Sequence, residues 1–75
     1  FNPTINFDIE INSISDIELS IHSMNGKLVD VLYSGNINPG NYQFSWDGSS
    51  YSSGIYIVTL KTYNSQTSHK ILYLK

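Results

Sequence analysis

Apolar and polar residues alternate along most of this chain, in short runs that end at turn-forming residues. A period of two is typical of a β-strand that buries one face. In the first run, residues 4–11, the polar positions include Asp8 and Glu10. The positions predicted to face the core are Ile5, Phe7, Ile9 and Ile11.

The second run, residues 16–22, is predicted to turn Ile17, Leu19 and Ile21 inward. Its outward positions would be Glu18, Ser20 and His22. Asn25 and Gly26 then separate this run from the next, residues 27–33. Because Asn and Gly tolerate positive φ angles, the pair predicts a hairpin with a type I′ turn.

A row of aromatic residues marks the fourth run, residues 42–48, after a loop expected over residues 34–41. Tyr42, Phe44 and Trp46 alternate with polar residues and would share one face. Facing outward, such a row would suit a sugar platform. The polar residues between them favour burial instead, so we expect the row at the centre of the core.

The last two runs, residues 55–63 and 69–75, are apolar on both faces and flank a polar loop at residues 64–68. In the closing sequence HKILYLK, Ile71 and Tyr73 would share one face, and Leu72 and Leu74 the other. We expect this strand to close the sandwich, which would account for its two apolar faces. Six short strands and no helical pattern predict an all-β chain with one domain over residues 1–75. The expected fold is a small immunoglobulin-like antiparallel β-sandwich of about six to seven strands.

Composition narrows the possible functions. The chain contains no alanine, which agrees with strands rather than helices. A net charge of −2, with four lysines and no arginine, argues against a nucleic-acid partner. Without cysteine, disulfides and thiolate–metal sites are excluded. No apolar run approaches the ~18 residues of a membrane span, so membrane insertion is not expected.

No arrangement of residues predicts catalysis, a cofactor or a metal. Serine is abundant, but no Gly-x-Ser-x-Gly motif occurs, so we expect no enzyme and no catalytic residue. His22 and His69 are expected to be two separate exposed imidazoles. The sequence DGSS at residues 47–50 lacks the later ligands of a calcium loop and is interpreted as a turn.

Two further sets of residues leave alternatives open. One is acidic and would form either a negative face, where the first two strands align, or an ordinary solvated surface. Its members are Asp8, Glu10, Asp16 and Glu18. The other consists of tyrosines that could contribute to a surface contact. These are Tyr33, Tyr51 and Tyr63.

Several segments in order resemble a known family: FNPT, IHSMNGKLVDVL, NPGNYQFSWDG, SSGIYIVTLK and the final KILYLK. Together they resemble the type A C-terminal sorting domain of type IX secretion cargo proteins of Bacteroidetes. The immunoglobulin-like module of the flagellar hook-capping protein is similar. The lead-in is shortened here, and His69-Lys70 replaces the usual Lys-Lys pair. Positions shared with the family are Gly40, Tyr42, Trp46, Asp47, Gly48, Gly54, Tyr56, Lys70 and Lys75. The glycines are expected at turns that need unusual φ angles, and the aromatics in the core.

The resemblance implies a sorting signal on a larger cargo protein, which travels through the periplasm to the outer-membrane surface or the medium. Its partners would be the upstream cargo domain, the outer-membrane translocon and a sortase-like peptidase that removes the domain. The removal can attach the cargo to anionic lipopolysaccharide. The alternatives are an immunoglobulin-like spacer of a surface or hook-associated protein, and a small carbohydrate-binding module. Recognition by the translocon is expected at Lys70, Ile71, Leu72, Tyr73, Leu74 and Lys75.

Overall fold

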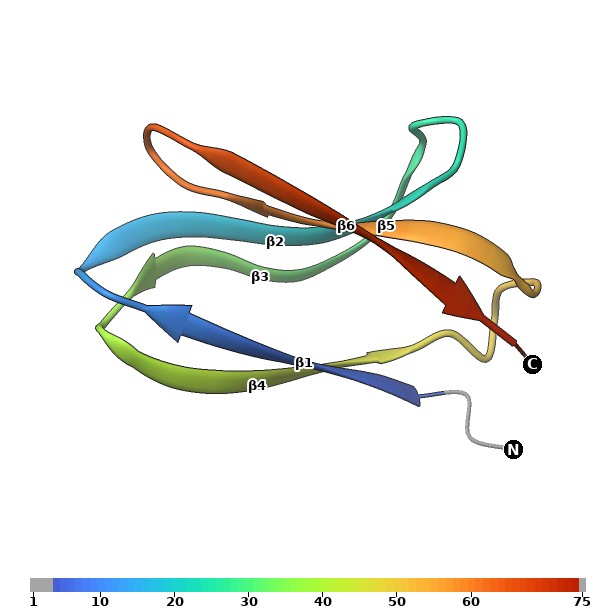
Figure 1. Ribbon diagram of the computed structural model, residues 1–75, viewed down its shortest axis with the longest axis horizontal. Coiled ribbons are helices and arrows are strands. Elements are labelled where there is room, and N and C mark those ends of the chain that lie inside the picture. Colours follow the sequence, from blue (N-terminus) through green and yellow to red (C-terminus); the bar gives the residue numbers. More distant parts are fainter. Residues whose placement is uncertain (1–3, 75) are drawn as a thin grey trace.

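The computed structural model describes residues 4–74, which form six strands in two antiparallel sheets packed as a sandwich (Figure 1). One sheet has two strands in the order β1-β4, and the other has four in the order β3-β2-β5-β6. The strands are β1 (Thr4–Ile11), β2 (Ser15–Ser23), β3 (Leu28–Ile37), β4 (Gly40–Asp47), β5 (Gly54–Lys61) and β6 (Gln66–Tyr73). The all-β sandwich is as predicted. The described residues contain no helix, and so none that could cross a membrane.

The main core lies between the sheets and is centred on Trp46, whose side chain is fully buried. Tyr42 and Phe44 lie half-buried on the same face of β4 as Trp46. The aromatic row is therefore part of the core and cannot serve as an outward sugar platform. The fully packed members of this core are Leu19, Ile21, Trp46, Tyr56, Val58 and Tyr73. A second buried cluster holds Ile11, Ile17 and Ile37.

Two predicted loops are shorter than expected. β3 continues to Ile37 and β4 begins at Gly40, so the loop predicted over residues 34–41 shrinks to residues 38–39. The extension makes Ile37 the last residue of β3 and buries its side chain. Likewise β6 begins at Gln66, not at residue 69, because the turn before it closes early. There the amide of Thr62 donates to the carbonyl oxygen of Ser65 at 2.8 Å.

The hairpin at Asn25-Gly26 is confirmed, but its predicted turn type is wrong. Gly26 has a φ of 88°, whereas Asn25 keeps a negative φ. The amide of Gly26 donates to the carbonyl oxygen of Ser23, and the amide of Ser23 donates to that of Lys27. This is a three-residue loop in which glycine alone takes the left-handed conformation. The Asn25 side chain accepts hydrogen bonds from Ser23 Oγ and Lys27 N.

Ser20 differs from expectation, and one of the two alternatives for the acidic residues is ruled out. Ser20 lies opposite Val31 on one side and Thr59 on the other, so this small outward side chain is only 3% exposed in the middle of its sheet. The acidic residues do not form one face, because β1 and β2 belong to different sheets. Asp8 and Glu10 lie on one sheet, and Asp16 and Glu18 on the other. The solvated-surface alternative is the one that fits.

Candidate functional site

The two faces of β6 have different environments. Ile71 packs against the main core, and Tyr73 is only 1% exposed. Leu72 and Leu74 are 64% and 60% exposed. The expectation that closing the sandwich explains both apolar faces is therefore wrong. The inner face of β6 packs in the core at Ile71 and Tyr73, and no layer among the described residues covers its outer face.

Three exposed side chains at the C-terminal end of the chain form what we call the outer row: Lys70 and Leu72 on the outer face of β6, and Leu74 just after the strand. Leu72 lies directly opposite Ile55 of β5, which is itself 41% exposed. Side chains paired in this way across antiparallel strands touch, so the apolar surface extends from β6 onto β5. Ile55 was not predicted from the sequence to belong to this surface. The two apolar faces of its run, residues 55–63, were the pattern that could have indicated an exposed apolar residue there. Lys75, also predicted for recognition, lies outside the described residues.

Tyr73 anchors the end of β6 in an aromatic cluster. Its ring centroid lies 5.3 Å from that of Trp46 and 6.2 Å from that of Tyr56. Gly48 forms the floor of the same site, since a Cβ added there would lie 2.8 Å from Cζ of Tyr73. The predicted reason for this glycine was therefore wrong, because Gly48 has no positive φ and is required by close approach. Gly40 and Gly54 do have positive φ values, of 151° and 158°.

The segment Trp46-Asp47-Gly48 connects the core to the turn that follows it. Trp46 stacks on Tyr51 with a centroid distance of 5.8 Å. Asp47 accepts a hydrogen bond from the amide of Ser49 at 3.0 Å, and this bond lowers the pKa of the Asp47 carboxyl. The amide of Tyr51 then donates to the carbonyl oxygen of Gly48 at 2.9 Å. The turn predicted at residues 47–50 is confirmed, and it holds Gly48 under Tyr73.

A family model described as the secretion system C-terminal sorting domain matches residues 2–74 of the chain. The chain belongs to this family. Comparison with curated proteins and with solved structures gave no significant match. The sorting domain is the C-terminal signal for type IX secretion, which implies a cargo upstream in the same chain and contact with the secretion machinery. Its route crosses the cell envelope to the surface or beyond. The family is one of sorting signals, with no known catalysis.

Two polar atoms in the core of the sorting domain have no hydrogen-bond partner among residues 4–74: Tyr73 Oη and Trp46 Nε1. Burial raises the pKa of the Tyr73 phenol, and the negative charge of Asp47 raises it further. Tyr73 therefore stays neutral wherever the domain is folded at ordinary pH. It serves as an apolar anchor rather than an acid or a base.

Other tyrosines brace the backbone of the sorting domain. The hydroxyl groups of Tyr42 and Tyr56 donate to the carbonyl oxygens of Asn38 and Ser52, each at 2.7 Å. Both bonds tie a strand to the turn preceding it. Tyr33 and Tyr51, considered for a surface contact, pack against the core instead. Of the three tyrosines so considered, Tyr63 is the free one, at 96% exposure.

The two histidines lie on opposite faces of the four-stranded sheet. His22 pairs with Ile57 and His69 with Val58, and these two neighbours on β5 point to opposite sides. His69 is exposed as predicted, whereas His22 is half-buried. Within residues 4–74, no group of three or more His, Cys, Asp or Glu side chains is placed to hold a metal ion.

Proposed function

We propose that the type IX machinery recognises the sorting domain at the outer row, Lys70, Leu72 and Leu74. The observation that carries this proposal is the exposure of Leu72 on β6 and of Leu74 just after it, while Ile71 and Tyr73 pack in the core. Leucines this exposed, at the end of a strand and just after it, add nothing to the core of the isolated domain. They are suited to contact with a second protein.

The position of β6 supports the same proposal. β6 is at the edge of its sheet, with β5 on one side and no paired strand on the other among the described residues. An unpaired edge offers backbone N–H and C=O groups to a partner strand, and exposed side chains supply specificity. Lys70 on this strand disfavours indiscriminate pairing. Tyr73 keeps the strand in place while the outer row remains free.

Removing the whole tail is a poor test, because it would also remove Ile71 and Tyr73 from the core. Substituting the outer row separates recognition from folding. A reporter fused to the sorting domain is expressed in a bacterium that has type IX secretion, with Leu72→Ser and Leu74→Ser introduced together. We expect the amount of reporter at the surface to fall by roughly tenfold, as for the loss of two central apolar contacts.

Ile14→Ser with Met24→Ser is the matched control, because these apolar side chains are 67% and 56% exposed elsewhere. This control is expected to be exported normally. Both pairs should unfold in urea near the parent's midpoint, which shows that folding is intact. Normal export of the Leu72 and Leu74 pair would refute recognition by the outer row.

We also propose the later steps that the family suggests. The cargo passes through the outer-membrane translocon, and a sortase-like peptidase then removes the domain and attaches the cargo to anionic lipopolysaccharide. Family membership supports this sequence of events. Different epitope tags on the cargo and on the sorting domain test it. Surface cargo should keep the first tag and lack the second, and surface cargo that keeps both would contradict removal.

A further inference from the structure

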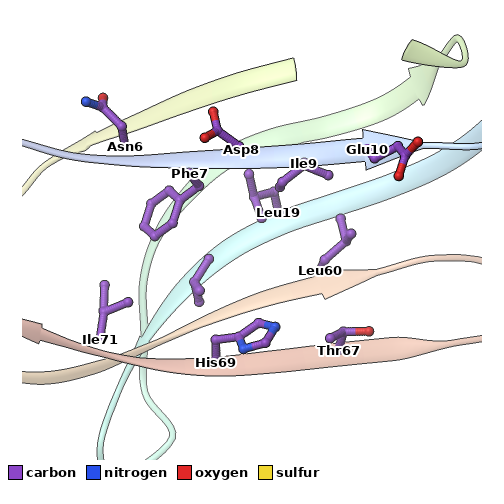
Figure 2. Close-up of a pocket in the computed structure, with 11 residues that line it drawn as sticks. Asn6, Phe7, Asp8, Ile9, Glu10, Leu19, Leu60, Thr67, His69 and Ile71 are labelled. Atoms are coloured by element: carbon purple, nitrogen blue, oxygen red, sulfur yellow. The ribbon is translucent and has the colours of Figure 1, made fainter. Parts of the chain in front are cut away.

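A groove of about 490 Å³ runs between β1 and β6 (Figure 2). Phe7 and Ile9 project into it from β1, and Ile71 and His69 project from β6. Its floor is made by Leu19, Val58 and Leu60 of the four-stranded sheet. Phe7, Ile9, Leu60 and Ile71 are half-buried, so part of their apolar surface remains open to the groove.

The groove exists because the two sheets have unequal widths. A two-stranded sheet lies over a four-stranded one and cannot cover all of it. Within the smaller sheet, β4 is the strand nearer β3, and β1 borders the groove above β5 and β6. Among residues 4–74, β1 pairs with β4 alone. Over residues 5–11, roughly half of the backbone N–H and C=O groups therefore point to an edge without a paired strand. One more strand beside β1 would satisfy these groups and cover the groove.

The charges of β1 indicate which strand fits. Asp8 and Glu10 lie at the margin of the groove with their carboxylates on the outer face of the two-stranded sheet (Figure 2). Their partners across β4 are Gln43 and Asn41, which are amides and not cations. Gln43 Nε2 lies 3.4 Å from Asp8 Oδ1, a long hydrogen bond. Both carboxylates therefore lack an opposite charge on their own sheet.

We propose that the free edge of β1 binds an extended segment of a partner protein, in which apolar residues alternate with lysine or arginine. The apolar side chains enter the groove and pack on Phe7, Ile9 and Leu60. The basic side chains lie on the outer face beside Asp8 and Glu10, where opposite charges on neighbouring strands attract. This surface is separate from the outer row of β6, so the two proposals stand independently.

A second copy of the chain fits this edge less well. Antiparallel pairing of β1 with β1 would bring two sets of Asp8 and Glu10 side by side on one face. Like charges on neighbouring strands are destabilising. The acidic residues thus disfavour self-pairing and favour a basic segment.

Three short blocked peptides added to the 75-residue chain test the proposal. In one, lysine and valine alternate; in the second, glutamate and valine alternate; in the third, the lysines and valines form two blocks. Amide chemical shifts in NMR spectra report the site and the affinity. We expect the alternating lysine peptide to shift the amides of Phe7, Asp8 and Ile9, and to bind at least about tenfold more tightly than the others.

Charge reversal supplies the matched variants. Asp8→Lys with Glu10→Lys should reverse the preference toward the glutamate peptide, whereas Asp16→Lys with Glu18→Lys, on the other sheet, should not. Equal binding of all three peptides, no binding of the lysine peptide, or shifts confined to other strands would overturn the proposal. A dimer of the chain alone, held through the β1 edge in sedimentation and NMR, would assign the groove to a second copy and also overturn it.

Discussion

The ring of Tyr73 lies against the backbone of Gly48, so close that a Cβ at position 48 would be 2.8 Å from Cζ of the ring. Position 48 follows β4 of the two-stranded sheet, and Tyr73 is the last residue of β6 in the four-stranded sheet. The contact therefore joins the two sheets at the end where the tail leaves the core. A glycine is required there by its neighbour and not by its own backbone angles.

Gly48→Ala should lower the free energy of unfolding by about 1–3 kcal/mol, as overpacking does in a core. Urea titration followed by Trp46 fluorescence measures it. The same substitution in a Tyr73→Val background should cost at least about 1 kcal/mol less, because the clashing ring is gone. Equal costs in the two backgrounds would show that Gly48 acts through something other than Tyr73.

Tyr73→Phe should leave the urea midpoint unchanged or raise it. The phenol Oη is buried without a partner among the described residues, and removing an unsatisfied polar atom relieves a desolvation cost. Tyr56→Phe is the matched control, because its hydroxyl donates to Ser52 and its removal should lower the midpoint. A clear loss of stability in Tyr73→Phe would reveal a hydrogen bond to that hydroxyl.

Alkaline pH should destabilise the domain through Tyr73. Its pKa in the fold lies above the ordinary value of 10.0, so the folded state holds this proton more tightly than the unfolded state does. The stabilisation is complete below pH 10 and is lost as the pH rises from 10 through the higher folded pKa. Tyr73→Phe should lose less stability between pH 9 and about 12 than the parent, as urea midpoints across this range will show. Parallel curves would argue against a shifted pKa.

The hairpin before β3 offers a comparison of two adjacent residues. Gly26→Ala should cost about 1–2 kcal/mol, since alanine must then adopt the left-handed conformation. Asn25→Ala should lower the free energy of unfolding by less. Asn25 has a negative φ that alanine can also adopt, so the substitution removes only exposed hydrogen bonds. A type I′ turn would make both positions require positive φ. Similar backbone costs at the two positions would favour that turn instead.

Alternation in the sequence was sufficient to predict the buried faces of β1, β2 and β4. It could not predict how far each strand extends, because Ile37 becomes a strand residue only by packing on Ile11 and Ile17 from distant segments. Nor could it separate burial from exposure for Leu72, since that depends on whether a second layer covers β6. The groove depends in the same way on the number of strands in each sheet, and the role of Gly48 depends on a ring 25 positions further along the chain.

The first residues of β1 and the last residues of β6 lie at the same end of the sandwich (Figure 1). A cargo joined ahead of β1 therefore lies at the same end of the domain as the outer row. A pulling force between the cargo and the tail would act across the two sheets at this end. It would separate the sheets progressively from there and would not shear the strands along their lengths. The contacts of the Tyr73 ring with the Trp46 ring and with the backbone of Gly48 would bear that load first. These contacts would therefore set the resistance of the domain to forced unfolding.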